Sequence, residues 1–332
     1  MKRDLEIILI TYNRKEHLQN TFNQIFADNS PIKNMPITIL DNKSTDGSSE
    51  LIQEYCKICH NIKHIIHNRN IGGNANIARA FELAKQKYVW ILCDDDEYDW
   101  SHWQEVEQAM AEDYDAIVVA NYVNPYKNIA QLVKQLTFVP AGIYKTENIT
   151  STVMVNAEFN LSNMFAQLAI VCNLINEQKR ICICENWIVK MVPNGCEETY
   201  VRGLDDNKHP LMAEMLWPVG FVNSMQMIKD KKIKKFILNN TKINDDNWYS
   251  NYISFLKSNK RLANNSLRNL CNLFCGLNIK QKILFLFCLI FFNLTYYLFF
   301  VELEHDKVHL LILGRLKTYI RFKPKREDGA SC

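Results

Sequence analysis

The start of the chain lacks the long uncharged run that a secretory signal peptide requires. The opening MKRDLEIILITYNRK is basic at first, but Asp4 and Glu6 interrupt it, and the apolar run is too short for a signal-peptide core. We therefore expect the N-terminal part to remain in the cytosol. The eleven cysteines also lack the spacing of a disulfide framework, so we expect them to be mostly reduced thiols.

A strong net charge is lacking as well. The 332 residues carry a formal net charge of +3, and residues 261–332 hold 11 lysines and arginines against 5 acidic residues. The basic charge is therefore concentrated in the C-terminal part, and we predict no nucleic-acid partner. The length suffices for a full α/β core with an additional region.

One cysteine spacing requires separate attention. Cys56, Cys59 and His60 form C-x-x-C-H, which is the pattern of c-type haem attachment. Haem attachment of this kind requires export, which nothing in the sequence directs. We therefore interpret both cysteines as structural residues on a helix face.

Short apolar runs alternate with helical patterns through the first hundred residues. Strands are predicted at 5–10, 37–40, 64–66 and 89–93, and helices at 48–59 and 74–87, with a further helix whose apolar face carries Leu18, Phe22, Ile25 and Phe26. Strands that alternate with helices of about 10 to 15 residues indicate βαβ crossovers. The predicted class is α/β with a mostly parallel sheet.

A polar cluster follows each predicted strand. The four clusters are residues 11–14, 41–46, 68–73 and 94–96. Ligands of open parallel sheets bind beyond the carboxyl ends of the strands. We therefore expect the four clusters to meet at one edge of the sheet.

The last cluster consists of three adjacent aspartates, Asp94, Asp95 and Asp96, directly after a buried strand. Like charges in this position repel one another. A divalent cation with a phosphate ligand would neutralise them, because hard oxygen ligands suit Mg²⁺ or Mn²⁺. The alternative is a solvated acidic loop in which Asp95 or Asp96 caps a following helix.

Four motifs in this order resemble the GT-A-fold glycosyltransferases of family 2, which use nucleotide-sugar donors. ILITYNR (8–14) is similar to the family's first strand and donor loop, ILDNKSTDGS (39–48) to its second strand, and YVWILCDDDEYD (88–99) to its D-x-D segment. NRNIGGNANIARA (68–80) resembles transferases of surface-polysaccharide and O-antigen assembly. The resemblance covers roughly residues 4–100.

The resemblance implies a role for each matching position. Asp41 would bind the base, expected to be uracil, in a pocket lined by Thr11, Tyr12 and Arg14. Asp94 would contact the donor's ribose or sugar, with Asp95 close by, and Asp96 would bind the Mn²⁺ or Mg²⁺ that bridges the diphosphate. Asn76 and Arg79, one helical turn apart, would face the donor, although Arg79 could equally be a surface cation.

A clear catalytic base is missing from the sequence. Inverting members of the family need a carboxylate that deprotonates the acceptor hydroxyl, and no acidic pair here matches the family's motif. Glu158, expected to precede a helix at 164–176, is the first candidate, and Glu185 after RICIC is the second; either could instead be an ordinary loop carboxylate. His209 is the candidate for a further metal ligand, with an exposed loop histidine as the alternative.

The C-terminal third predicts membrane contact. Residues 283–301, ILFLFCLIFFNLTYYLFFV, contain no charge and reach the lower length of a spanning helix, and residues 308–322 are predicted to form an amphipathic helix. KDKKIKK (229–235) could attract anionic lipid or form a solvated face. Because basic residues flank 283–301 on both sides, we expect peripheral or monotopic attachment to the cytoplasmic face of the inner membrane.

The expected organisation is a GT-A catalytic domain at 1–225, a basic segment at 226–260 and a helical membrane-associated tail at 261–332. Within the catalytic domain, residues 1–100 would bind the nucleotide sugar and residues 101–225 the acceptor, expected to be a lipid-linked glycan. The alternatives are a Mg²⁺-dependent phosphohydrolase with Asp94, Asp96, Asp205 and Asp206, and a membrane-bound nucleotide-sugar-binding protein without transferase activity.

Overall fold

Apolar strands that alternate with helices build a seven-stranded sheet in this computed structural model, which describes residues 4–120, 128–192, 220–241, 279, 282–283, 299–304, 307–312 and 315–321. The strand order is β3-β2-β1-β4-β7-β6-β8. The strands are β1 (Leu5–Thr11), β2 (Ile37–Asp41), β3 (Ile62–Ile66), β4 (Tyr88–Leu92), β6 (Ala116–Val118), β7 (Gly142–Lys145) and β8 (Ile181–Ile183).

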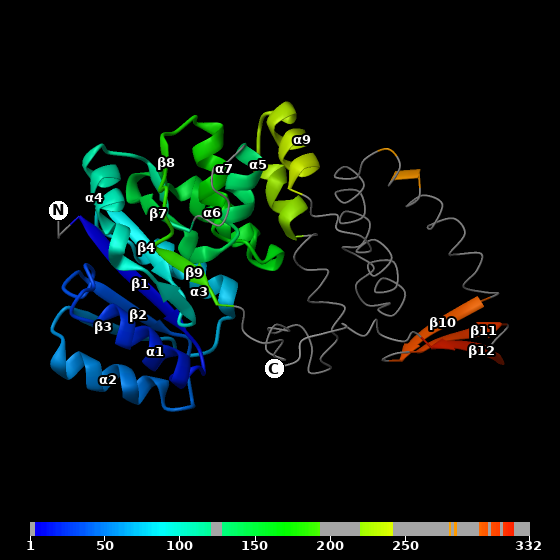
Figure 1. Cartoon of the computed structure of the whole chain (residues 1–332), viewed down its shortest axis with the longest axis horizontal. Coiled ribbons are helices and arrows are strands. Elements are labelled where there is room, and N and C mark those ends of the chain that lie inside the picture. The colour runs from blue at the N-terminus through cyan, green and yellow to red at the C-terminus, as the bar shows by residue number, and fades with distance from the viewer. Residues whose placement is uncertain are drawn as a thin grey trace, which may run out of the picture.

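All neighbouring strands of this sheet are parallel except for β7, which runs antiparallel to both β4 and β6. The carboxyl ends of the six parallel strands therefore lie at one edge. Figure 1 shows β1, β2 and β3 on one side of the central β4, and β7 and β8 on the other. The predicted α/β class with a mostly parallel sheet is confirmed.

Helices connect these strands. They are α1 (Lys15–Ile25), α2 (Ser48–Ile58), α3 (Gly73–Leu83), α4 (Trp103–Ala111), α5 (Ile129–Gln135), α6 (Ser151–Phe159), α7 (Leu168–Asn176) and α9 (Lys231–Asn240). Short 3-10 turns are η1 (Trp100–His102), η2 (Val139–Ala141), η3 (Thr146–Asn148), η4 (Leu161–Asn163) and η5 (Met225–Met227). A separate two-stranded sheet pairs β5 (Asp96–Tyr98) with β9 (Val189–Met191).

The core lies between the sheet and these helices. Every residue of β1 and β4 is buried, as expected for central strands of a parallel sheet that is covered on both faces. α3 packs against β1 and β4, and α4 packs against β6. On α1 the residues facing the core include Leu18, Phe22 and Ile25, as predicted from their spacing.

Two predicted helix bounds need correction. The helix predicted at 74–87 ends at Leu83, because the carboxylate of Glu6 accepts hydrogen bonds from the amides of Lys85 and Gln86 and holds this stretch outside the helix. The helix predicted at 164–176 begins only at Leu168, since Met164 adopts a left-handed backbone with φ of 71° after η4.

The C-terminal part differs from the prediction more strongly. The amphipathic helix expected at 308–322 is wrong, because residues 308–312 and 315–321 belong to strands of an antiparallel sheet. Its strands are β10 (Phe299–Glu304), β11 (Lys307–Ile312) and β12 (Arg315–Arg321). The two connections each contain two residues, a length typical of hairpins, and Val301, Glu302, Leu303 and Glu304 alternate with period two. Residues 284–298 of the uncharged run lie outside the described residues. No described helix has the length and apolar character needed to span a membrane.

Candidate functional site

The loops after β1, β2 and β4 meet through side-chain hydrogen bonds. Thr11 Oγ1 donates to Asp94 Oδ2 at 2.6 Å, which joins the ends of β1 and β4. The amide of Asn13 donates to Ser44 Oγ at 2.9 Å, and Asn13 Oδ1 accepts from the amide of Thr45 at 2.7 Å. These contacts confirm that the polar clusters gather at one edge of the sheet.

An asparagine pair joins the loop after β3 to the same edge. Asn42 Nδ2 donates to Asn70 Oδ1 at 2.8 Å, and Asn42 Oδ1 accepts from the amide of Ile71 at 2.9 Å. Asn70 Oδ1 also accepts from the amide of Gly72, whose φ of 86° leads into α3. The sequence prediction missed the linking roles of Asn13, Asn42 and Asn70; the recurrence of Asn after successive strands was the available signal.

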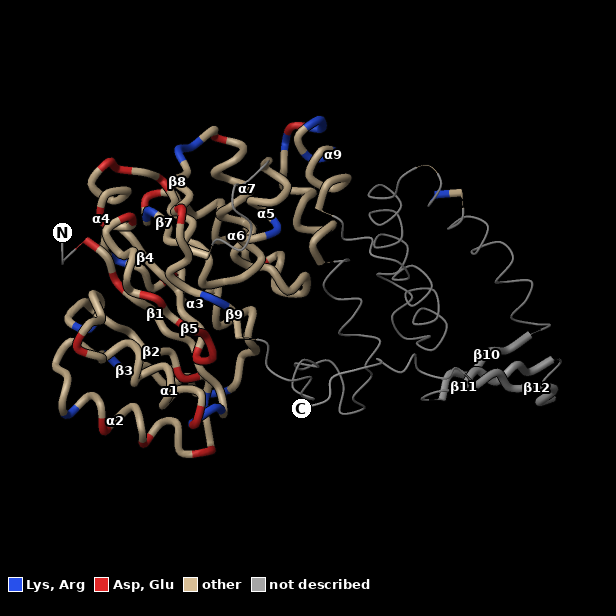
Figure 2. The backbone as a smooth tube through the Cα atoms, viewed as in Figure 1, with Lys and Arg blue, Asp and Glu red and all other residues tan. Residues whose placement is uncertain are grey.

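The acidic segment lies in a tight turn between β4 and β5, and Figure 2 shows acidic residues gathered around β5. Arg14, the N-cap residue of α1, places a guanidinium nitrogen 2.7 Å from Asp95 and 3.5 Å from Asp94. The positive charge of Arg14 therefore offsets part of the negative charge of the turn.

Asp96 is the least compensated of the three aspartates. Asp96 is only 4% exposed, and its Oδ2 atom has no hydrogen-bond partner within the described part of the chain. Burial, together with the charges of Asp95 and Asp94, raises the pKa of Asp96 to about 8, although Arg14 acts in the opposite direction. A buried carboxylate without a partner is costly, and a bound cation would remove that cost.

The side chains around Asp96 fit a divalent cation. Ligand atoms of Cys93, Asp95 and Asp96 all lie within 4.8 Å of one another. Mg²⁺ and Mn²⁺ prefer carboxylate oxygen to thiol sulfur, so Asp95 and Asp96 are the appropriate ligands and Cys93 is the weaker one. The orphaned oxygen of Asp96 and this arrangement of donors agree with a metal site.

Asp41 lies at the end of β2 and is completely buried. Its carboxylate accepts hydrogen bonds from the amide of Ser44 at 2.7 Å and from the hydroxyl of Ser49, and His64 Nε2 lies 3.7 Å away. Burial would raise the pKa of Asp41, but His64 and the two serines outweigh it and lower the pKa to about 2. Asp41 is therefore ionised at neutral pH. Tyr12, in the donor loop expected from the sequence, is 41% exposed.

The two predicted donor residues of α3 are separated by the structure. Asn76 is buried, and its Oδ1 lies 2.9 Å from His67 Nε2. Arg79 is exposed, and its guanidinium pairs with Glu82, which lies about one helical turn after it on α3. Arg79 thus occupies the surface position that was its alternative interpretation.

The base candidates lie on different elements. Glu158 is exposed in the last turn of α6, which packs against α3, and Leu161 O nearby accepts from Asn74 Nδ2 at 2.7 Å. Glu185 is exposed just after β8, where its amide donates to Glu105 at 2.6 Å. Glu185 therefore follows the carboxyl end of β8, whereas Glu158 lies within α6, whose end is linked to the start of α3. His209 and the pair Asp205 and Asp206 lie outside the described residues.

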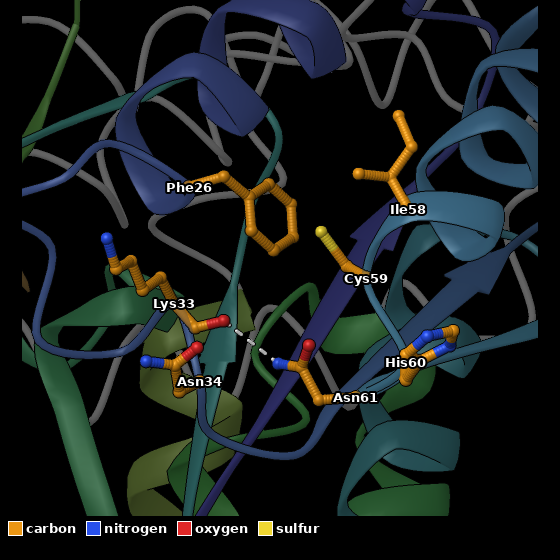
Figure 3. A pocket seen from close by; sticks show the side chains of 7 residues that line it. All are labelled: Phe26, Lys33, Asn34, Ile58, Cys59, His60 and Asn61. Atoms are coloured by element: carbon orange, nitrogen blue, oxygen red, sulfur yellow. Dashed lines mark hydrogen bonds between the residues drawn. The ribbon is translucent and has the colours of Figure 1, made fainter.

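The C-x-x-C-H motif lies elsewhere. Cys56 belongs to α2 and Cys59 caps its end, as expected for structural residues. Cys59 and His60 line a cavity of about 380 Å³. Figure 3 shows them with the other lining residues, which are Phe26, Lys33, Asn34, Ile58 and Asn61. These residues surround the ends of α1 and α2 and the start of β3, at the opposite edge from the aspartates. The motif therefore takes no part in the acidic site.

Comparisons with known proteins agree with this geometry. Residues 6–168 match the model of glycosyl transferase family 2. The abequosyltransferase RfbV of Salmonella typhimurium is 37% identical over 89 residues, which is 26% of this chain and 26% of RfbV. The curated relatives are matched over only 26% to 40% of their own lengths.

Two solved structures show the same fold. TarS of S. aureus, residues 1–349 in complex with UDP-GlcNAc, aligns with a TM-score of 0.58 at 14% identity and covers 93% of this chain and 97% of that one. The mannosyltransferase PcManGT of Pyrobaculum calidifontis, in complex with GDP-Man and Mn²⁺, aligns with a TM-score of 0.52 at 11% identity, covering 88% and 87%. These likenesses confirm the predicted GT-A fold. Through residues 6–168, the chain belongs to glycosyl transferase family 2.

Proposed function

We propose that this protein is an inverting, metal-dependent glycosyltransferase that moves one sugar from a UDP-sugar to a glycan acceptor. The observation that carries the proposal is the buried carboxylate of Asp96 beside Asp95, at the edge where four strand-end loops meet. Its Oδ2 has no hydrogen-bond partner among the residues that the structure describes. Solved structures of the same fold hold UDP-GlcNAc in one case and GDP-Man with Mn²⁺ in the other, which supports a nucleotide-sugar donor.

Each residue of the edge has a proposed task. Ionised Asp41 would contact the nucleobase, in a pocket lined by Thr11 and Tyr12. Asp94, which accepts a hydrogen bond from Thr11, would contact the ribose or sugar of the donor. Asp95 and Asp96 would hold a Mn²⁺ or Mg²⁺ ion, whose charge stabilises the diphosphate as a leaving group. Arg14 pairs with the carboxylates of Asp94 and Asp95 and holds them in place.

The acceptor hydroxyl needs a base on the face opposite the leaving group. We propose Glu158 for this role because α6 packs against α3, whose first turn follows the Gly72 loop. Glu185 is the second candidate, at the carboxyl end of β8. Both carboxylates are exposed, so an acceptor could reach either of them from solvent.

The proposed acceptor is a lipid-linked glycan at the cytosolic leaflet of the inner membrane. Helix α9 supports membrane contact from within the described residues, because Ile237 and Leu238 are buried while the other face is basic. That face exposes three lysines and Phe236, which is 43% exposed; the lysines are Lys231, Lys232 and Lys235. Clustered lysines with an exposed aromatic side chain suit an anionic lipid surface.

Calorimetric titration with a panel of nucleotide sugars, with and without Mn²⁺, tests the donor site. Wild type should bind one class of donor in a Mn²⁺-dependent manner, and Asp96→Ala should lose this binding. Glu97→Ala is the matched control, because Glu97 is the exposed neighbour whose carboxylate pairs with Lys190 at 3.9 Å. No binding of any nucleotide sugar to folded wild type would refute the proposal. Selective binding of GDP-sugars would show that the nucleobase of the donor is guanine instead of uracil.

Binding alone would not distinguish an enzyme from a protein that only holds the donor. Transfer of radiolabelled sugar to a lipid-linked glycan extract, or slow release of UDP without an acceptor, would establish turnover. Donor binding without either product would favour the binding protein, whereas hydrolysis of simple phosphate monoesters would favour the phosphohydrolase.

A further inference from the structure

The free edge of β5 is completed by a side chain. One edge of β5 pairs with β9, where Asp96, Glu97 and Tyr98 lie opposite Met191, Lys190 and Val189. In a strand, residues two apart direct their backbone groups to the same side. The carbonyl of Asp96 and the amide of Tyr98 therefore share one edge, and both are hydrogen-bonded to α1 instead of to another strand.

Gln24 makes both of these hydrogen bonds. Its Nε2 donates to the carbonyl oxygen of Asp96 at 3.1 Å, and its Oε1 accepts from the amide of Tyr98 at 3.0 Å. A carboxamide offers one donor group and one acceptor side by side, as a peptide unit of a neighbouring strand would. The backbone carbonyl of Gln24 also accepts from Trp100 Nε1 at 3.3 Å.

These contacts determine where Asp96 can lie. Asp96 is the first residue of β5 and directly follows the tight turn at Cys93, Asp94 and Asp95. Three-residue strands have few hydrogen bonds, so losing the two from Gln24 would leave β5 attached mainly through β9. The other end of α1 holds the same turn, because its N-cap residue Arg14 contacts Asp95 at 2.7 Å. Residues at the two ends of α1 therefore both contact the acidic segment: Arg14 contacts Asp95, and Gln24 contacts β5.

We propose that Gln24 is a positioning residue that fixes the carboxylate of Asp96 for cation binding. This inference rests on the proposed function, since it assigns Gln24 a role in the affinity of the metal site. Replacing a residue that orients a metal ligand through hydrogen bonds commonly lowers metal affinity by about 10- to 100-fold. Leucine in place of Gln24 retains the approximate volume but removes both hydrogen bonds to β5.

Gln19→Leu is the matched control on the same helix. Gln19 is also partly buried and also makes two side-chain hydrogen bonds, to Asn23 at 3.1 Å and to the hydroxyl of Tyr55 at 2.8 Å, but it does not contact β5. Thermal unfolding in EDTA would show how much general stability each variant loses. The two changes remove comparable numbers of hydrogen bonds, so the control measures what such a loss does away from the acidic turn.

Two readouts test the proposal on the full chain. Titration with Mn²⁺ alone, followed by the electron paramagnetic resonance signal of the free ion, should show affinity at least about tenfold weaker in Gln24→Leu and near wild type in Gln19→Leu. Hydrogen exchange by mass spectrometry without metal should show faster exchange at residues 96–100 in Gln24→Leu alone.

The outcomes separate this inference from the proposed function. Wild-type Mn²⁺ affinity in Gln24→Leu, or equal weakening in both variants, would overturn the positioning role. If wild type itself bound no Mn²⁺, the metal site of the proposed function would be refuted. Unchanged exchange at residues 96–100 in Gln24→Leu would refute the claim that Gln24 holds β5 in place, whatever the metal affinity.

Discussion

Protonation of Asp41 should destabilise the fold in a narrow range of acid pH. The carboxylate is completely buried, and its contacts with His64, Ser44 and Ser49 lower its pKa to about 2 from the ordinary 3.8. A group whose pKa is lowered by folding stabilises the folded state above its ordinary pKa, and that contribution is lost as the pH falls through the lower value. The difference between the two pKa values corresponds to about 2 kcal/mol of unfolding free energy.

Urea unfolding of wild type and Asp41→Asn, followed by tryptophan fluorescence between pH 5 and pH 2, measures this contribution. Many carboxyl groups titrate in this range, so the informative quantity is the difference in unfolding free energy between the two proteins at each pH. Asparagine cannot ionise, and its single side-chain oxygen cannot replace both carboxylate oxygens that accept from Ser44 and Ser49. We expect wild type to be the more stable protein at pH 5 and its advantage to shrink by about 2 kcal/mol towards pH 2.

Asp28→Asn serves as the control for this experiment. Asp28 is fully exposed and pairs only at the surface with Lys33 at 3.0 Å. Exposed pairs of this kind contribute little, so its difference from wild type should stay small at every pH. A difference between wild type and Asp41→Asn that did not change with pH would refute the assignment of the lowered pKa to Asp41.

Three further predictions concern the acidic turn, the base and α9. Asp96→Asn should raise the unfolding temperature in EDTA at pH 8, and this gain should vanish towards pH 4. The reason is that folding raises the pKa of Asp96 from 3.8 to about 8, so its ionisation in the folded state costs stability as the pH rises through this range. A gain in differential scanning calorimetry that did not change with pH would contradict this. If Glu158 is the base, Glu158→Gln should lower kcat by about 100-fold or more with donor affinity unchanged, whereas Glu185→Gln should not, and the reverse result in steady-state kinetics would exchange their roles. Replacing Lys231, Lys232 and Lys235 on the exposed face of α9 with glutamate should reduce sedimentation of the protein with phosphatidylglycerol vesicles but leave donor binding unchanged. Sedimentation equal to that of wild type would show that α9 does not contact the membrane.

The parallel half of the fold could be predicted because its signals are local. Strands buried on both faces require continuous apolar runs, and β1 and β4 supply them. The polar residues at their ends were therefore expected to share an edge, and the hydrogen bond between Thr11 and Asp94 agrees with this expectation. The antiparallel β7 was not predicted, since its four residues pair across a long sequence separation.

Side-chain direction was the part that the sequence could not supply. Asn76 and Arg79 share a helix at a spacing that allows one common face, yet packing turns the first inward towards His67 and leaves the second outside with Glu82. Gln24 gave no signal at all, because its importance arises from a strand that lies 72 residues later in the chain. The apolar and basic residues at 308–322 satisfied a helical pattern, whereas the structure pairs β11 with β10 and with β12.

The hydrogen bonds at the carboxyl edge divide it into parts with different sensitivities to the solution. Asn13 joins the loops after β1 and β2 through Ser44 and Thr45, and Asn42 joins those after β2 and β3, all through neutral groups. The turn after β4 is instead attached through Asp94 and Asp95. Salt and cations act on charged groups far more strongly than on hydrogen bonds between neutral groups. The turn after β4 can thus rearrange its charges around an arriving ion while the asparagine links between the first three loops stay in place. Those links then act as a template, and the turn after β4 is the element that responds to the ion.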